Sequence, residues 1–156
     1  MDSIFYREIK EFDWKLNERI AELEKKNMGS ESSINQWVIP VIIRYGKFIA
    51  AVSGNGDSDI IGVCEIIRDW EKEKSAFIHS FYIDGEYRDR GIGKKLLDKV
   101  IDILRNENFR TVELTVDPDN KPAVHIYREA GFREIGFRKS EYGRGVDRSL
   151  MSLKLK

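Results

Sequence analysis

Two long segments carry apolar residues at the spacing of an amphipathic helix. Segment 91–106 shows the clearer stripe, because lysines and aspartates occupy the other face of the expected helix. Segment 12–26 repeats the pattern, with charged residues between its apolar positions. We therefore expect helices over both segments. The stripe of segment 91–106 consists of Leu96, Leu97, Val100, Ile101 and Leu104.

Shorter runs rich in β-branched and aromatic residues predict strands. The glycine-containing tripeptide 45–47 indicates a hairpin between the second and third of these strands. The charged link 69–74 indicates another hairpin, between the fourth and fifth. The predicted strands are 3–9, 37–44, 48–52, 60–67, 77–83, 111–116, 132–138 and 150–155.

The remaining segments predict one short helix and two irregular stretches. A helix is expected over 122–130, since Pro122 suits a first helical turn and Gly131 a helix end. Segments 27–35 and 53–57 are expected to be a loop and a turn, because serine, glycine and asparagine dominate them. Strands lie on both sides of helix 91–106, and several are joined by hairpins. The chain therefore belongs to the α/β (α+β) class, with helices on the faces of a mixed sheet.

Length and composition narrow the class of protein. The 156 residues fit one domain spanning 1–156, and 41% hydrophobic with 35% charged residues predicts a soluble globular chain. Lysine plus arginine equals aspartate plus glutamate, 27 each, which argues against a nucleic-acid or anionic-membrane partner. No apolar run approaches the roughly 20 residues that span a bilayer, and the N-terminus lacks the pattern of a signal peptide.

The cysteine and histidine content bears on compartment and metal binding. The single cysteine, Cys64, cannot form an intrachain disulfide, which fits a reducing cytoplasm. His79 and His125 are the only histidines, and with one cysteine they do not compose a zinc cluster. We therefore expect a cytoplasmic protein without a metal site.

The most informative segment is the turn between the apolar strand 77–83 and helix 91–106. The free N–H groups of a first helical turn bind anions, and the helix dipole adds partial positive charge. Glycines here let an anion approach the backbone, and the basic side chains add charge. The spacing differs from the P-loop and the dinucleotide fingerprint, and an ordinary turn with solvated basic residues is the alternative. The turn reads Arg88-Asp89-Arg90-Gly91-Ile92-Gly93-Lys94.

In this turn and in a later motif, the chain resembles the GNAT superfamily of N-acetyltransferases. The stretch Arg88-x-x-Gly91-x-Gly93 matches the family signature, and a second motif follows at the usual distance. The resemblance covers roughly 60–155, the acetyl-CoA-binding core, while 1–55 is the variable, acceptor-side part. It implies about seven largely antiparallel strands with a splayed central pair. The second motif is Asn120-x-x-Ala123-x-x-x-Tyr127-x-x-x-Gly131-Phe132.

The same resemblance implies a site for acetyl-CoA (coenzyme A). Its arm would lie between the splayed strands and pair with the backbone of Phe81, Tyr82 and Ile83, as an added strand would. A backbone N–H of that segment would stabilise the developing oxyanion. Asn120 would hydrogen-bond the arm. The pyrophosphate would be held by Arg88, Asp89, Arg90, Gly91, Ile92, Gly93 and Lys94.

Catalytic roles follow from the resemblance in part. Tyr127 matches the residue that often protonates the leaving thiolate, and a core tyrosine is the alternative. Phe77 stands where many members carry a glutamate base. His79, two residues on and on the same strand face, is a candidate base suited by a pKa near 6.5; a satisfied core histidine is the alternative. Glu65 is a rival base facing either a polar cleft or solvent.

The chain has one more candidate for the general base, and it departs from the family pattern at further positions. Glu113 is a second rival base, on the strand after the turn. Thr115 replaces the glutamate of members that acetylate ribosomal-protein N-termini. Gly85 replaces a proline that is common after this strand. In relatives the segment 141–147 lines the acceptor site, but its mixed charges name no substrate.

The expected function is transfer of an acetyl group to a primary amine by direct attack in a ternary complex. Cys64 is interpreted as a buried small hydrophobe rather than an acyl carrier. A non-catalytic acyl-CoA-binding or sensing module is the alternative, and transfer of a longer acyl group stays open. The acceptor is a small-molecule or peptide amine. A homodimer is consistent with many relatives.

Overall fold

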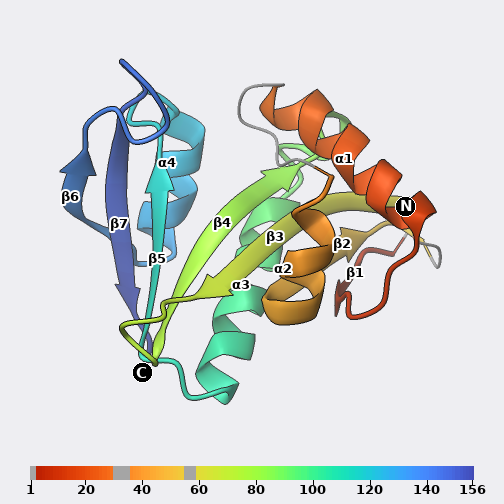
Figure 1. The fold of residues 1–156 in the computed structure, drawn as a ribbon, viewed down its shortest axis with the longest axis horizontal. Helices are drawn as coiled ribbons and strands as arrows, with labels where there is room; N and C mark the ends of the chain where they lie inside the picture. Colours follow the sequence, from red (N-terminus) through yellow and green to blue (C-terminus); the bar gives the residue numbers. More distant parts are fainter. Residues whose placement is uncertain (1–2, 30–35, 55–58) are drawn as a thin grey trace.

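A computed structural model describes residues 3–29, 36–54 and 59–156 (Figure 1). Seven strands form one sheet with the order β1-β2-β3-β4-β5-β7-β6. Neighbouring strands are antiparallel except β4 and β5, which are parallel, so the predicted mixed, largely antiparallel sheet is confirmed. The strands are β1 (Phe5–Glu8), β2 (Lys47–Val52), β3 (Ile60–Arg68), β4 (Ser75–Ile83), β5 (Thr111–Val116), β6 (Arg133–Arg138) and β7 (Arg148–Lys154).

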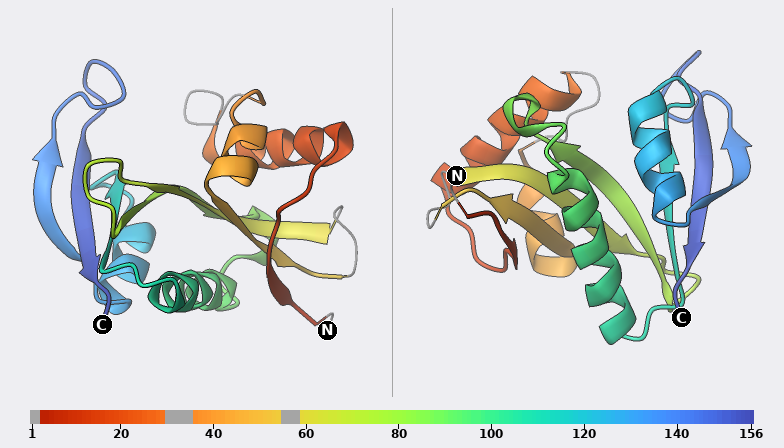
Figure 2. Two further views of the ribbon diagram at one scale, coloured as in Figure 1. Left: turned by 60° about the horizontal axis from the view of Figure 1, so that its bottom comes forward. Right: turned by 180° about the vertical axis from the view of Figure 1, so that it is seen from behind.

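The helices cover both faces of the sheet (Figure 2). Helices α1 (Trp14–Met28) and α2 (Ile39–Tyr45) pack on one face, which we call the front face. Helices α3 (Ile92–Asn106) and α4 (Lys121–Glu129) pack on the opposite, back face. A short 3-10 helix, η2 (Gly85–Tyr87), connects β4 to the turn before α3. Two apolar clusters result, one on each side of the sheet.

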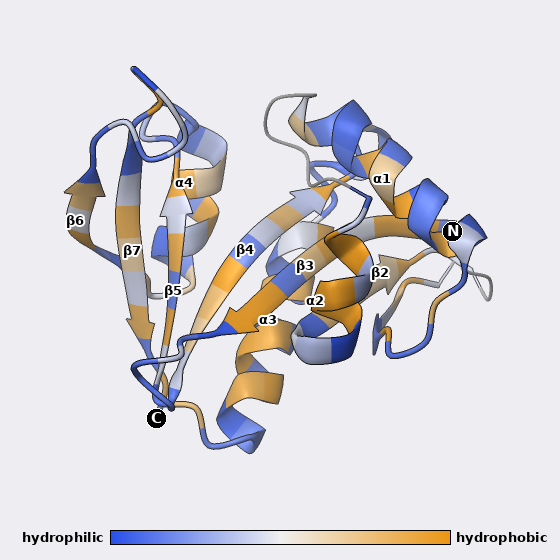
Figure 3. Cartoon of the chain, in the orientation of Figure 1, coloured by the Kyte–Doolittle hydropathy of each residue, from blue (hydrophilic) through white to orange (hydrophobic). Residues whose placement is uncertain are grey.

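Helix α3 follows the predicted stripe. All five predicted apolar positions are buried against the back face, and the other face of the helix is polar (Figure 3). Helix α1 begins after Asp13, whose side chain accepts a hydrogen bond from the N–H of Leu16 at 2.9 Å. Such capping is typical of a helix start. Both long helices are confirmed, and α1 extends beyond the predicted end to Met28.

The predicted strand 37–44 is wrong, because this stretch contains helix α2. Pro40 lies in its first turn, where the missing N–H costs nothing. Three buried isoleucines, Ile39, Ile42 and Ile43, lie at helical spacing. The predicted hairpin at 45–47 is therefore wrong as well, since β2 pairs with β1 and β3.

The predicted loop and turn fall only partly within the described residues. Asn27 and Met28 belong to α1, and 30–35 lie outside the description, as do 55–58 of the predicted turn. The hairpin between β3 and β4 is confirmed. Among the helices within the described ranges, none is both long and apolar enough to cross a membrane.

Candidate active site

Strands β4 and β5 part in the middle of the sheet. Their parallel pairing runs from Ser75 opposite Thr111 to Ile78 opposite Leu114 and stops there. Both strands continue beyond this point, β4 to Ile83, and Figure 1 shows them diverging. The predicted splay is therefore confirmed. The β5-facing backbone edge of β4 beyond Ile78 has no strand partner among the described residues, and an extended ligand can pair with such an edge.

A β-bulge lies where the two strands part. The partners of β4 along β3 step from Ser80, opposite Glu65, to Ile78, opposite Ile66. His79 is therefore the extra residue of a bulge on β4. Bulges redirect side chains and are common beside active sites. This one places His79 at the start of the open edge, with its side chain exposed.

The turn before α3 presents an uncapped helix N-terminus. Gly91 precedes the helix in the left-handed conformation, with φ of 74°, and no side chain caps the helix there. The first-turn N–H groups of α3 have no acceptor within the helix. They also lie at the positive end of the helix dipole. Gly93 lies in this turn: a Cβ there would come within 4 Å of Phe81, Ile83 and Ile126. The glycine keeps this surface, between β4 and α4, open.

The arginine side chains of the turn are engaged by the protein itself. Arg88 donates from Nε to the carbonyl oxygen of Ile83 at 3.0 Å. Arg90 donates from Nη2 to the carbonyl oxygen of Glu86 at 3.0 Å, and its guanidinium lies 5.3 Å from the centre of the Tyr87 ring. The backbone of the turn is therefore better placed than these two side chains to meet an anion. The side chain of Lys94 is exposed.

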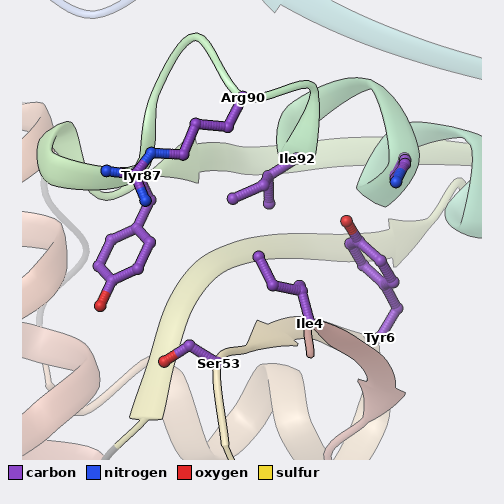
Figure 4. Close-up of a pocket in the computed structure, with 7 residues that line it drawn as sticks. Ile4, Tyr6, Ser53, Tyr87, Arg90 and Ile92 are labelled. Atoms are coloured by element: carbon purple, nitrogen blue, oxygen red, sulfur yellow. The ribbon is translucent and has the colours of Figure 1, made fainter. Parts of the chain in front are cut away.

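Arg90 points into a pocket on the other side of the turn (Figure 4). Ile4, just before β1, and Tyr6 of β1 line this pocket, which has a volume of about 500 Å³. None of the described residues that line it belongs to β4, β5 or α4. Its lining residues are Ile4, Tyr6, Ser53, Tyr87, Arg90, Ile92 and Lys95.

Tyr127 of α4 lies in a row of aromatic rings on the back face. Its ring centre is 5.9 Å from that of Phe81 and 5.8 Å from that of Phe132. Burial, with a smaller contribution from Cys64, raises the pKa of Tyr127 above its ordinary value. The phenol therefore keeps its proton at neutral pH, and its contact with Phe81 brings it to the open part of β4. The raised pKa makes the phenol a weaker acid, so the case for Tyr127 as a proton donor rests on its position beside β4.

The environment of His79 suits a proton acceptor. Partial desolvation lowers the pKa of His79 below its ordinary value of 6.5, while the charge of Glu24 acts in the opposite direction. The ring is therefore neutral at pH 7, with a free lone pair. It lies on β4, whereas Tyr127 reaches this strand from α4.

Glu65 is part of a buried polar group on the front face. Its side chain is fully buried, so the expectation that it faces solvent is wrong. Burial and the charge of Glu24 raise the pKa of Glu65 to about 10. Tyr82 is 5% exposed, and its pKa is raised by burial and by both glutamates. Glu65 is thus a neutral acid at pH 7, and in this form it cannot accept a proton from an amine.

Other predicted site residues lie around the parted strands. Asn120 caps α4, its Oδ1 accepting from the N–H of Ala123 at 3.3 Å. Glu113 is half-buried on β5, opposite Phe77. The hydroxyl oxygen of Thr115, also on β5, lies 3.3 Å from that of Tyr142 in the β6–β7 connection.

Sequence reasoning missed Glu24 and Asn27 of α1. Glu24 follows Ile20 by four residues and so shares its buried helix face. A charged residue on the apolar stripe of a predicted helix was the available signal for Glu24. Asn27 carried no such signal, because its partners lie 58 and 61 residues away.

Comparison with known proteins agrees with this geometry. The sequence profile described as "Acetyltransferase (GNAT) family" matches residues 9–132. An uncharacterized N-acetyltransferase of Methanocaldococcus jannaschii is 36% identical over 89 residues, which are 57% of this chain but only 39% of that protein. The ribosomal-protein bS18-alanine N-acetyltransferase of Escherichia coli is 27% identical over 99 residues, 64% of this chain and 62% of the relative.

A solved structure shares the fold over nearly the whole chain. The NatC complex bound to Gag peptide and CoA contains a chain that superposes with a TM-score of 0.82 at 19% identity, covering 98% of this chain and 99% of its own length. The family profile spans more than half of the sequence and includes the parted strands, the turn and all of α4. The chain belongs to the acetyltransferase (GNAT) family.

Proposed function

We propose that this protein is an acetyl-CoA-dependent N-acetyltransferase that acts on a primary amine. The observation that carries the proposal is the open edge of β4, which leads directly to the uncapped N-terminus of α3. An extended amide-containing chain with an anionic end matches both features in order. The family supports the same assignment.

The residues that would hold the cofactor follow from this arrangement. The backbone of Phe81–Ile83 pairs with the pantetheine arm, and the first-turn N–H groups after Gly91 bind the pyrophosphate. Asn120, whose Oδ1 caps α4, contributes its amide nitrogen as a donor. Acetyl-CoA supplies the acetyl group as a thioester. One backbone N–H of β4 donates to the oxygen on which negative charge develops.

Two side chains would move protons. A lysine-like amine with a pKa near 10.4 is almost entirely protonated at neutral pH, so His79 accepts that proton and leaves the amine free to attack. Tyr127, protonated at neutral pH, donates to the sulfur that departs. The two residues reach the parted strands from different elements, which fits one proton removed from the acceptor and one delivered to the leaving group.

The acceptor is a primary amine that would approach from the front face, opposite α3 and α4. Peptide N-termini are the first class to test, because the E. coli relative is named for acetylating a ribosomal-protein alanine. Thr115 stands where such enzymes are expected to carry glutamate, so lysine, polyamines, amino sugars and amino acids belong in the same screen.

An acceptor screen tests the proposal. Purified protein is mixed with acetyl-CoA and each amine, and release of free thiol is followed against a no-acceptor blank. We expect at least one amine class to be acetylated, with the acetyl-amine product identified by mass spectrometry. Tight CoA binding with no transfer to any amine would favour the acyl-CoA-binding module. A longer acyl chain co-purifying with the protein would redirect the screen to that acyl-CoA.

A further inference from the structure

The last turn of α1 is joined by side-chain bonds to the end of β4 and to the turn that follows it. Lys26 donates from Nζ to Oδ1 of Asp84 at 2.9 Å, and the Asp84 side chain is only 6% exposed. Ser80 donates from its hydroxyl to the sulfur of Met28 at 3.2 Å. A front-face helix is thus fastened at several points to the strand that carries the open edge.

Asn27 makes the most specific of these connections. Its Nδ2 donates to the carbonyl oxygen of Leu23 at 2.8 Å, which fixes the orientation of the amide. Its Oδ1 then accepts from the N–H of Gly85 at 3.0 Å and from Nη2 of Arg88 at 3.4 Å. We call these three hydrogen bonds the Asn27 clamp. The two bonds that Oδ1 accepts join α1 to both ends of η2, the short helix that leads into the proposed anion-binding turn.

The clamp depends on the residue at position 85. A proline there, which the family resemblance leads one to expect, has no N–H to donate. Gly85 supplies that donor. A Cβ at this position would have only Oδ1 of Asn27 within 4 Å, at 3.9 Å, and the glycine does not adopt positive φ. Neither space nor backbone conformation therefore requires glycine here.

Arg88 is the second partner of the clamp. Its guanidinium spans from the Ile83 carbonyl oxygen, at the end of β4, to Asn27 of α1. This arginine is the first residue of the Arg-x-x-Gly-x-Gly motif, yet its side chain is bonded within the protein. Its role in the turn is therefore to hold the connection between β4 and α3 in one shape.

We propose that Asn27 is a positioning residue that preorganises the pyrophosphate-binding turn through Gly85 and Arg88. A turn already held in its binding shape loses less conformational freedom when the anion binds, so affinity rises without any contact between Asn27 and the ligand. The proposal rests on the assignment of this turn to CoA. It predicts that loss of the clamp weakens binding of the pyrophosphate part of CoA and spares the pantetheine part.

Two matched substitutions at position 85 distinguish the effect of losing the N–H donor from the effect of replacing glycine. Gly85→Pro removes the N–H, and Gly85→Ala keeps it in a position with room for a methyl group. Asn27→Ala removes the acceptor of both bonds to Gly85 and Arg88. The dissociation constants of CoA and of pantetheine, which lacks the nucleotide and the phosphates, are measured by NMR titration of each variant. Thermal unfolding accompanies each titration.

We expect Asn27→Ala and Gly85→Pro to weaken CoA about tenfold, the effect of roughly one to two lost hydrogen bonds. Their pantetheine affinity stays at the wild-type value, and Gly85→Ala stays close to wild type for both ligands. Equal losses for CoA and pantetheine, or a Gly85→Ala loss as large as that of Gly85→Pro, would overturn the proposal. If Asn27→Ala does not fold, the position-85 pair decides.

The same titration distinguishes this proposal from the proposed function. Wild-type protein that fails to bind CoA would overturn the assignment of the turn, and the role of the clamp with it. If the wild type binds CoA and both Asn27→Ala and Gly85→Pro bind it equally well, only the proposed role of the clamp would be overturned. Neither result depends on finding the acceptor amine.

Discussion

The back and front faces of the sheet use different parts of the chain for their chemistry. On the back face, the proposed anion site is backbone, the uncapped helix N-terminus after Gly91. It lies near an edge of β4 that has no strand partner beyond Ile78 among the described residues. On the front face, the chemistry lies in side chains from separate elements, such as Glu24 of α1 and Glu65 of β3. A backbone site needs local glycine spacing and so leaves a short motif, whereas a side-chain site leaves none.

Tyr127→Phe gives the largest expected effect and tests the back face. The substitution removes only the hydroxyl and keeps the ring against Phe81 and Phe132. If Tyr127 donates the proton to the leaving thiolate, kcat falls by about 10²–10⁴-fold. Steady-state kinetics and CoA titration measure the two quantities separately. Unchanged kcat would make Tyr127 a core tyrosine, and a parallel loss of CoA affinity would make it a binding residue.

His79→Ala tests the other proton transfer and has a smaller expected effect, about a hundredfold in kcat. Activity requires the neutral ring, so in the wild type kcat rises with pH through the pKa of His79. Partial desolvation places this pKa below 6.5. The variant loses this acidic limb of the pH–rate profile. Persistence of the limb would locate the base elsewhere, with Glu113 the next residue to replace.

Glu65→Gln tests the buried acid on the front face. Folded Glu65 keeps its proton up to about pH 10, whereas the unfolded chain releases it near the ordinary value of 4.5. The folded state therefore binds more protons, and the free energy of unfolding falls as pH rises through this window, by at most about 1.4 kcal/mol per pH unit. Glutamine cannot ionise, so the variant loses this dependence.

Urea unfolding at several pH values between 5 and 9 measures this dependence for both proteins. The same variant should keep the kcat of the wild type at pH 7, because a neutral acid is not the base. Identical pH slopes for the two proteins would mean that Glu65 ionises in the fold. A large fall in kcat with unchanged CoA binding would restore it as a catalytic candidate.

Gly91→Ala gives the smallest expected effect. No atom lies within 4 Å of a Cβ at this position, so the cost comes from the backbone, held at φ of 74°. A non-glycine residue in this region costs about 1 kcal/mol of stability. Gly85→Ala, at a position of ordinary φ, is the control and should leave the unfolding midpoint unchanged. Equal midpoints for the two variants would contradict the left-handed turn.

Much of the fold follows from local pattern, and the exception shows why pattern can fail. The stripe of α3 and the positions along the chain of the strands from Ile60 onward were predicted, because period and turn residues agree there. Helix α2 was predicted as a strand. Its run of β-branched residues favours a strand by propensity, but Pro40 and the spacing of the three isoleucines suit a helix packed on the front face. Tertiary packing decided between the two.

The residues of the candidate site also fall into two kinds, those in a local motif and those that only the folded structure brings together. Gly91, Gly93 and Tyr127 were found because their motifs are local. The sequence also named His79, but only the register between β3 and β4 reveals that it is a bulge residue. Glu24 and Asn27 could not be paired with Glu65 and Gly85 from sequence, since these pairs join α1 to residues far along the chain, in β3 and η2.

The most direct test of the account is an NMR titration of ¹⁵N-labelled protein with acetyl-CoA. We expect the largest amide shifts on Phe81–Ile83 and on Gly93 and Lys94, the open edge of β4 and the first turn of α3. Tyr6 and Ser53, in the pocket on the other side of the turn, should shift little. Shifts centred on that pocket, or no saturable binding, would contradict the account.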